Sequence, residues 1–167
     1  RTGEQREDFM LGVGASQAHK RMELAIEAIA KWPAPKPPWV WIGNRCSAGY
    51  RKRIEARAAR LNVQLILKTQ LPDAELISHL ARARLFIYTS RLEPFGLTPL
   101  EANACGTPVV AVREGGTLET IQDDVNGMLC HVPPASIAVA HGQLVTNPHL
   151  IERMGSSSRP HVVDNWT

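Results

Sequence analysis

Residues 85–112 read LFIYTSRLEPFGLTPLEANACGTPVVAV, and this stretch decides the fold. Its two apolar ends, Leu85–Tyr88 and Val109–Val112, predict buried strands. Between them, Thr98 is expected to open a short helix, with Pro99 as its first residue and the following Gly-x-Pro at its end. A strand, a loop, a short helix and a second strand make a parallel crossover. The loop of such a crossover lies at the carboxyl edge of the sheet, where open α/β sheets bind ligands.

Two carboxylates, Glu93 and Glu101, flank this loop with seven residues between them. Between the carboxylates, the backbone N–H groups of Gly96, Leu97 and Thr98 enter the helix N-terminus. Its unpaired donors and partial positive charge suit a phosphate. The two carboxylates could each bind hydroxyl groups of a phosphate-linked sugar or ribose. For Glu101 a structural alternative stays open, because Thr98-x-x-Glu101 is also the pattern of a capping box.

The rest of the chain alternates between strand and helix patterns. Further strands are predicted at residues 9–14, 39–43, 63–67 and 128–130. Further helices are predicted at residues 20–32, 50–61, 73–83, 117–122, 135–145 and 148–154, the last weakened by the glycine, serines and proline that follow it. Trp39 and Trp41 are expected to face the core together. The alternation predicts an α/β fold, a Rossmann-like three-layer sandwich with a parallel sheet of about six strands.

Length and composition fit a single domain. The chain has 167 residues, enough to bury a sizeable core. Residues 1–8 are polar and are expected to be disordered or a linker remnant, with the domain at residues 9–167. Because the chain begins at Arg1 rather than Met, we expect a piece of a longer protein. Its three cysteines lack metal-ligand spacing and are expected to be reduced thiols of a cytosolic protein.

Charge and hydropathy narrow the classes of partner. The net charge of +3 fits an anionic ligand without proving nucleic-acid binding. Basic residues gather at 51–60, but no aromatic residues are interleaved with them, so a solvated helix face is favoured over nucleic acid. No apolar run approaches the ~20 residues of a membrane-spanning helix. No metal is expected, because Asp-x-Asp is absent and the six histidines show no paired spacing.

The block from Glu93 to Val110 resembles the donor-site signature of group 1 retaining glycosyltransferases. That signature has two glutamates separated by seven residues, a helix of small residues and a Gly-x-Pro-Val-Val strand, as this chain has. Members of the family have the GT-B fold, so the resemblance implies that this chain is one half of such a fold. It also implies that Glu93 contacts the donor sugar and that Glu101 holds the ribose.

The resemblance covers nearly all of the chain from residue 9 onward. It implies that Gly14 and Lys20, at and after the end of the first strand, bind the donor phosphates. Lys20 is then a catalytic residue together with Glu93. The loop around Leu71 corresponds to the segment whose backbone reads the nucleobase.

One position departs from the family pattern. The family usually has an arginine directly after the glycine that ends its first strand, and this chain has Ala15 there. An alanine side chain offers no planar fork of donors to a diphosphate. Arg21 could compensate as a donor-binding residue, or it could point to solvent.

The resemblance therefore predicts the donor-binding domain of a retaining glycosyltransferase, which transfers a sugar from a nucleoside-diphosphate sugar to an acceptor. The amino-terminal acceptor domain is expected to be absent from this chain, and the fragment alone is expected to be inactive. No cofactor is expected, since basic groups and a helix dipole take the place of a metal in the family. A cytoplasmic location is expected, with the inner membrane surface as an alternative for the full-length protein.

Other functions stay open. A dinucleotide-binding domain is disfavoured, because Gly12-x-Gly14 lacks the third glycine and Gly43-Asn44 provides no acidic residue for a ribose. A non-catalytic sugar-nucleotide-binding module, for which Ala15 argues, would have the same fold. So would a GT-B epimerase or hydrolase, because a fold does not determine a function.

Overall fold

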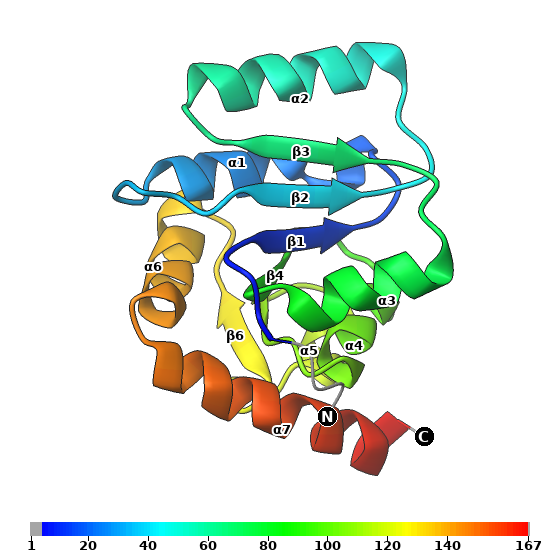
Figure 1. The fold of residues 1–167 in the computed structure, drawn as a ribbon, viewed down its shortest axis with the longest axis vertical. Helices are drawn as coiled ribbons and strands as arrows, with labels where there is room; N and C mark the ends of the chain where they lie inside the picture. The colour runs from blue at the N-terminus through cyan, green and yellow to red at the C-terminus, as the bar shows by residue number, and fades with distance from the viewer. Residues whose placement is uncertain (1–4, 167) are drawn as a thin grey trace.

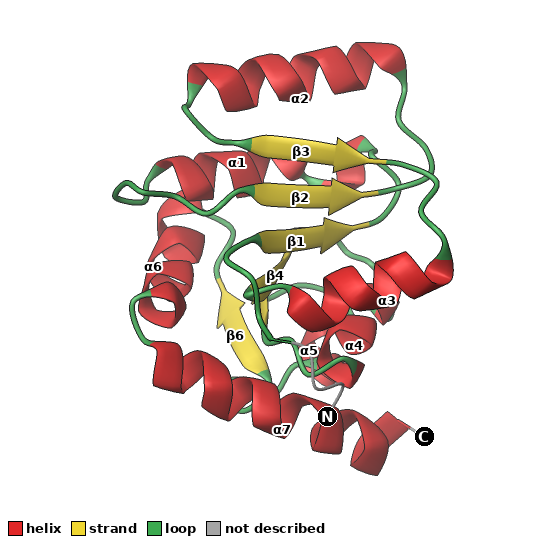
Figure 2. Cartoon of the chain, in the orientation of Figure 1, coloured by secondary structure: helices red, strands yellow, loops and turns green. Residues whose placement is uncertain are grey.

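The computed structural model describes residues 5–166 and consists of a parallel sheet flanked by helices (Figure 1). The strands are β1 (Met10–Val13), β2 (Trp39–Ile42), β3 (Leu65–Lys68), β4 (Leu85–Tyr88), β5 (Val109–Val112) and β6 (Gly127–Cys130). The helices are the short 3-10 helix η1 (Ala18–Lys20), α1 (Met22–Ala30), α2 (Ala48–Arg60), α3 (Asp73–Arg82), α4 (Leu97–Ala104), α5 (Thr117–Thr120), α6 (Pro134–Val145) and α7 (Pro148–Trp166). Figure 2 shows how strands and helices alternate along the chain.

The strands pair in the order β3-β2-β1-β4-β5-β6, and every pair is parallel. The chain builds outward from β1 to β3, then returns to β4 beside β1 and builds outward in the other direction. The order therefore reverses between β1 and β4, which is the position in the sheet at which open α/β folds bind ligands. The predicted α/β fold with a parallel sheet of about six strands is confirmed.

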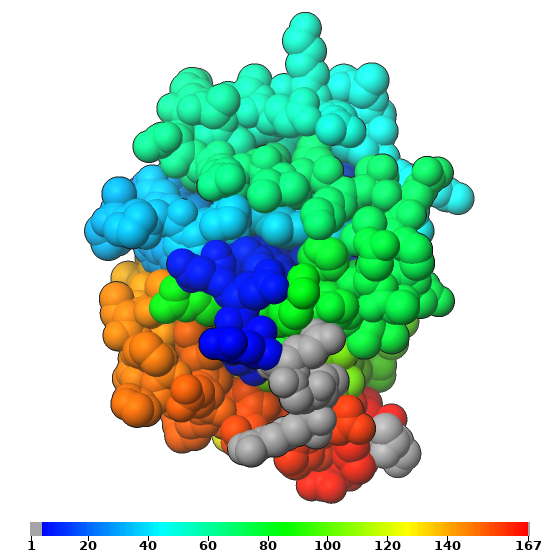
Figure 3. Space-filling model, in the orientation of Figure 1, coloured from blue at the N-terminus to red at the C-terminus, as the bar shows by residue number. Residues whose placement is uncertain are grey.

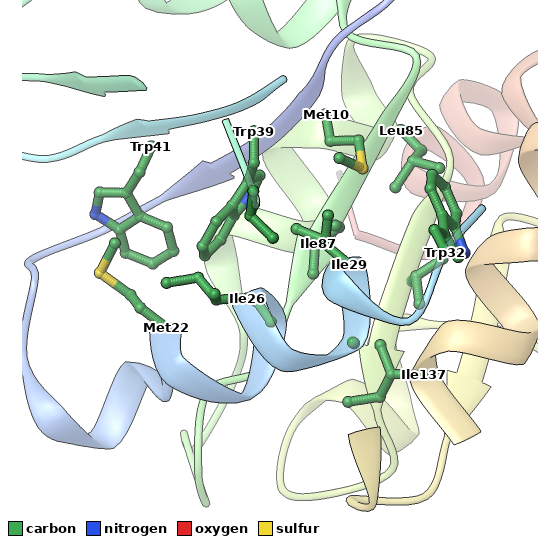
Figure 4. Close-up of a cluster of buried hydrophobic side chains, with 14 of the residues drawn as sticks. Met10, Met22, Ile26, Ile29, Trp32, Trp39, Trp41, Leu85, Ile87 and Ile137 are labelled. Atoms are coloured by element: carbon green, nitrogen blue, oxygen red, sulfur yellow. The ribbon is translucent and has the colours of Figure 1, made fainter. Parts of the chain in front are cut away.

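Two hydrophobic cores cover the two faces of the sheet. Trp39 and Trp41 point to the face covered by α1, α2 and α6, where their rings meet edge to face with centroids 5.6 Å apart. Figure 4 shows both rings above Met22 and Ile26 of α1. The other residues of β2 join the second core, under α3 and α4. The prediction that both tryptophans face the core together is confirmed.

Two helices differ from their predicted bounds. α4 begins at Leu97, after Gly96 in a left-handed conformation with φ 75°, so Pro99 is its third residue rather than its first. α7 runs through the glycine, serines and proline that were expected to weaken it. Packing outweighs the low helix propensity of these residues, because α7 lies along α4 and a Cβ at Gly155 would come 2.7 Å from the Gly106 carbonyl oxygen.

Two other helices start where local geometry requires it. The helix predicted from residue 20 begins at Met22, because η1 and a left-handed Arg21 with φ 49° precede it. α2 begins at Ala48, two residues before its predicted start. Ser47 caps it by accepting a hydrogen bond from the Tyr50 N–H at 3.2 Å.

Part of the segment expected to be disordered or a linker remnant contacts the domain. Residues 1–4 of that segment lie outside the described residues. Arg6 donates to the Ala83 carbonyl at 2.9 Å and to Thr107 Oγ1 at 3.1 Å. The Glu7 N–H donates to the Arg82 carbonyl at 2.7 Å. These long-range hydrogen bonds hold residues 6 and 7 against the domain.

Gly43, directly after β2, determines how closely the loop after β1 can approach. A Cβ at Gly43 would lie 2.1 Å from the Gly14 carbonyl oxygen, whereas a Cβ at Gly49 in α2 would meet nothing within 4 Å. Gly43→Ala is therefore expected to lower the free energy of unfolding by about 1–3 kcal/mol. The control Gly49→Ala is expected to leave it unchanged or raise it by up to ~1 kcal/mol, since alanine favours a helix. Urea denaturation checks both variants, and equal changes would contradict the role of Gly43.

Candidate functional site

Lys20 and Glu93 form an ion pair at the switch point of the sheet. Lys20 ends η1 in the loop after β1, and Glu93 lies in the loop after β4. Lys20 Nζ is 2.6 Å from Glu93 Oε1, and the two side chains are 8% and 31% exposed. A buried ammonium group requires a counter-charge, which Glu93 supplies. The fold thus brings together two predicted site residues that are 73 positions apart in the sequence.

Besides the ion pair, hydrogen bonds to backbone carbonyl groups hold the two loops against each other. Gly14 has φ 145°, and a Cβ there would lie 3.1 Å from Lys20 Cε, so glycine leaves room for the lysine. The Thr89 hydroxyl donates to the Lys20 carbonyl at 2.8 Å. The Arg91 N–H donates to the His19 carbonyl at 2.7 Å. Gly14, Lys20 and the loop after β4 therefore form one connected site.

Tyr88 also belongs to this site, and the sequence analysis missed it. It is the last residue of β4 and 4% exposed, and its hydroxyl donates to Glu93 Oε2. Lys20 Nζ lies 5.8 Å from the centroid of the Tyr88 ring. In the sequence, Tyr88 is part of an apolar run that predicts a strand. The one available signal was a hydroxyl group at the strand end, five residues before a glutamate.

α4 begins at Leu97, four residues after Glu93. Gly96 precedes the helix, and Leu97 and Thr98 are its first two residues. The first N–H groups of a helix have no intrahelical acceptor, so they remain as donors for a ligand. Gly116, in the turn after β5, donates its N–H to the Glu93 carbonyl at 2.9 Å and supports this loop from the other side.

Glu101 lies in α4, one turn further along the helix. Glu101 as a whole is exposed, but its carboxyl group is partly desolvated, and this desolvation raises the pKa of the group. The capping-box alternative for Glu101 is wrong. The helix begins before Thr98, it has no side-chain cap bond, and Thr98 Oγ1 has no hydrogen-bond partner.

The side chains of two predicted site residues contact other parts of the chain. The guanidinium of Arg21 forms an ion pair with Glu114, in the loop after β5, rather than lying beside Lys20. Leu71 follows β3, which lies two strands from β1, and its side chain packs against the core under α3.

Other ligand classes find little support among the described residues. Over residues 5–166, no group of three or more His, Cys, Asp and Glu side chains could hold a metal ion. In the same range, no helix has the length and apolar character needed to cross a membrane.

α2 lies at one end of the molecule (Figure 3). Most of its basic side chains have acidic partners, in the pairs Arg51–Glu55, Arg53–Glu23 and Arg57–Glu27. This pairing favours the solvated-face interpretation over nucleic-acid binding.

Two relatives of known name match much of the chain. The D-inositol 3-phosphate glycosyltransferase of Thermobifida fusca is 31% identical over 165 residues, which are 92% of this chain and 38% of that protein. The GDP-mannose-dependent alpha-(1-6)-phosphatidylinositol monomannoside mannosyltransferase of Mycolicibacterium smegmatis is 33% identical over 127 residues, 70% of this chain and 33% of that protein. The chain thus spans no more than about two fifths of the length of these relatives.

Solved structures have the same fold. Sucrose-phosphate synthase from Thermosynechococcus elongatus has a TM-score of 0.85 at 25% identity, covering 95% of this chain and 41% of its own. HepE from Anabaena, solved with UDP-glucose, has a TM-score of 0.85 at 23% identity, covering 96% and 45%. The C-terminal domain of LpcC from Francisella tularensis, a group 1 family protein, has a TM-score of 0.84 at 24% identity, covering 98% and 88%. These neighbours identify the Rossmann-like domain as one half of a GT-B fold.

The family assignment rests on nearly the whole chain. The family model described as "Glycosyl transferases group 1" matches residues 2–161. That range includes both loops of the switch point and all of α4. This chain belongs to the group 1 glycosyltransferase family.

Proposed function

We propose that this chain is the donor-binding half of a retaining glycosyltransferase, which transfers a sugar from a nucleoside-diphosphate sugar to an acceptor. The observation that carries the proposal is the Lys20–Glu93 pair at the switch point, next to the N-terminus of α4. One cation, one carboxylate and a set of helix N–H donors are the groups that a sugar linked to a diphosphate requires.

The proposed chemistry follows from the charge on the leaving group. Glycosyl transfer expels a nucleoside diphosphate, so negative charge grows on the leaving phosphate oxygen. The Lys20 ammonium and the first N–H groups of α4 would stabilise that charge, with no metal or other cofactor required. Glu93 would orient the donor sugar and Glu101 the ribose, while the backbone near Leu71 would contact the nucleobase.

The names of relatives support a nucleotide-sugar donor. The Mycolicibacterium relative is named as GDP-mannose-dependent, and HepE was solved with UDP-glucose. The name of the Mycolicibacterium relative also contains a lipid, phosphatidylinositol. This supports the proposal that a longer, cytoplasmic form of this protein acts at the inner membrane surface. The same longer form would supply the amino-terminal acceptor domain, and the likeness to an isolated C-terminal domain supports that division.

A second candidate is a sugar-nucleotide-binding module without transferase activity. Ala15 favours it, because the arginine that the family usually has there is absent. The guanidinium of Arg21, the residue that could replace that arginine, pairs with Glu114 instead. Transfer activity of the longer protein distinguishes the two candidates.

The isolated chain is expected to transfer no sugar. A two-domain active site must close around its substrates to align the acceptor and exclude water. The measurement is transfer of radiolabelled sugar from UDP-glucose, GDP-mannose and ADP-glucose to a panel of acceptors by the chain alone. Measurable transfer would show that the acceptor site lies within this chain.

Lys20→Ala is expected to weaken binding of the preferred nucleoside diphosphate by about 1.5–3 kcal/mol, the range for a charge-assisted hydrogen bond. Binding of the free nucleoside should hardly change, because it lacks the phosphates. Thermal shift with UDP, GDP and ADP identifies the preferred nucleotide, and calorimetry gives the affinities. Lys52→Ala, an exposed lysine of α2, is the control. Equal losses for nucleoside and diphosphate would rule out the phosphate role.

Glu101→Gln is expected to melt near wild type, because the side chain is exposed and does not cap α4. The same variant is expected to bind the nucleoside diphosphate several-fold more weakly. A charged carboxylate holds two ribose hydroxyls more tightly than a neutral amide does. Glu55→Gln on α2 removes an exposed carboxylate outside the site and serves as the control. Wild-type affinity in Glu101→Gln would exclude the ribose role.

A further inference from the structure

The side chains next to Glu93 in its loop are largely exposed to solvent. Its neighbours Leu92 and Phe95 are 66% and 40% exposed, and Arg91 and Pro94 are exposed as well. The Glu93 side chain is therefore fixed mainly by what its two carboxylate oxygens contact. Oε1 accepts from Lys20, and Oε2 accepts from the Tyr88 hydroxyl.

Tyr88 is a rigid support for that carboxylate. It ends a buried strand, in register with Ala111 of β5, and its ring stacks on Phe86 with centroids 6.5 Å apart. A buried tyrosine hydroxyl requires a hydrogen-bond partner, and here the partner is the loop carboxylate rather than a core carbonyl. The bond thus connects the carboxylate of the loop to a buried strand of the sheet.

A bound donor would compete with one of the two contacts of Glu93 and leave the other in place. A diphosphate carries more negative charge than a carboxylate, and it would compete with Glu93 for Lys20. Tyr88 is neutral and buried, so a diphosphate would not attract its hydroxyl group as strongly as it attracts Lys20. When Lys20 turns to the phosphates, the hydroxyl of Tyr88 is the contact that keeps Glu93 in place.

We propose that Tyr88 is a positioning residue that holds the Glu93 carboxylate toward the donor sugar while Lys20 binds the diphosphate. This inference rests on the proposed function of the site. A merely structural tyrosine would contribute to stability alone. A positioning tyrosine also affects the gain in affinity that the sugar adds to the nucleoside diphosphate.

Tyr88→Phe removes the hydroxyl and keeps the ring. Calorimetry compares UDP with UDP-glucose, GDP with GDP-mannose and ADP with ADP-glucose for wild type and variant. The variant should bind the preferred nucleoside diphosphate within about twofold of wild type, and its sugar nucleotide about five- to tenfold more weakly, as expected for a weakened hydrogen bond to a charged group.

Tyr50→Phe is the matched control. The Tyr50 hydroxyl donates to Glu23 Oε2 at 3.0 Å, so this change removes the same kind of tyrosine–glutamate hydrogen bond outside the site. It should lower stability in urea to a similar extent and leave both affinities unchanged. Glu93→Gln combined with Tyr88→Phe tests whether Tyr88 acts through Glu93. In the Glu93→Gln background, Tyr88→Phe should cause no further loss of sugar-nucleotide affinity.

The outcomes separate the inference from the function on which it rests. A wild-type chain that binds none of the six nucleotides overturns the proposed function, and the role of Tyr88 with it. A wild type that binds, together with a Tyr88→Phe variant that keeps the full contribution of the sugar, overturns only the role of Tyr88. A further loss in the Glu93→Gln background shows that Tyr88 acts on the donor by another route and also overturns the inference.

Discussion

A lysine buried at the carboxyl edge of a sheet costs free energy unless a counter-charge meets it, and the Lys20–Glu93 pair satisfies that requirement. The pair can form only because β1 and β4 are neighbours, which places the loops after them side by side. Several other features serve this approach. Gly14 leaves space for the lysine, Gly43 leaves space for the Gly14 carbonyl, and Thr89 holds the backbone of Lys20.

Left-handed backbone conformations gather around the same loops. Gly14, Gly96 and Gly115 have positive φ values of 145°, 75° and 60°, and glycine adopts them at little cost. Arg21 and Leu92 have φ values of 49° and 47°, which cost a non-glycine residue about 1–2 kcal/mol each. Such strain persists only where the surrounding structure imposes it, and it is typical of functional sites. Here the surrounding structure is the pairing of the two loops.

The sheet could be predicted from the sequence because local patterns encode its elements. Each strand is an apolar run, and each helix shows the helical spacing of apolar residues. The sequence also placed Lys20 and Glu93 in one site, through resemblance and through the edge at which parallel strands end. It could not predict the pairing of Arg21 with Glu114, 93 residues away, because no local pattern encodes it. Tyr88 was missed for a related reason, since an aromatic residue in an apolar run indicates a strand whatever its hydroxyl contacts. α7 was predicted too short, because its packing along α4 compensates for residues that form helices poorly.

Charge balance suggests how the proposed site would distinguish its ligand. Lys20 and Glu93 neutralise each other, as do Arg21 and Glu114, so a simple phosphate could take either cation only by breaking an ion pair. A diphosphate alone could take Lys20 only by leaving Glu93 without its cation. In the proposed function, a sugar nucleotide would exchange both partners at once, because its phosphates would replace the carboxylate at Lys20 while its sugar hydroxyls would replace the ammonium at Glu93. If the proposed function is correct, the ion pair would therefore favour the intact donor over free phosphate, since only the intact donor offers a new partner to both Lys20 and Glu93.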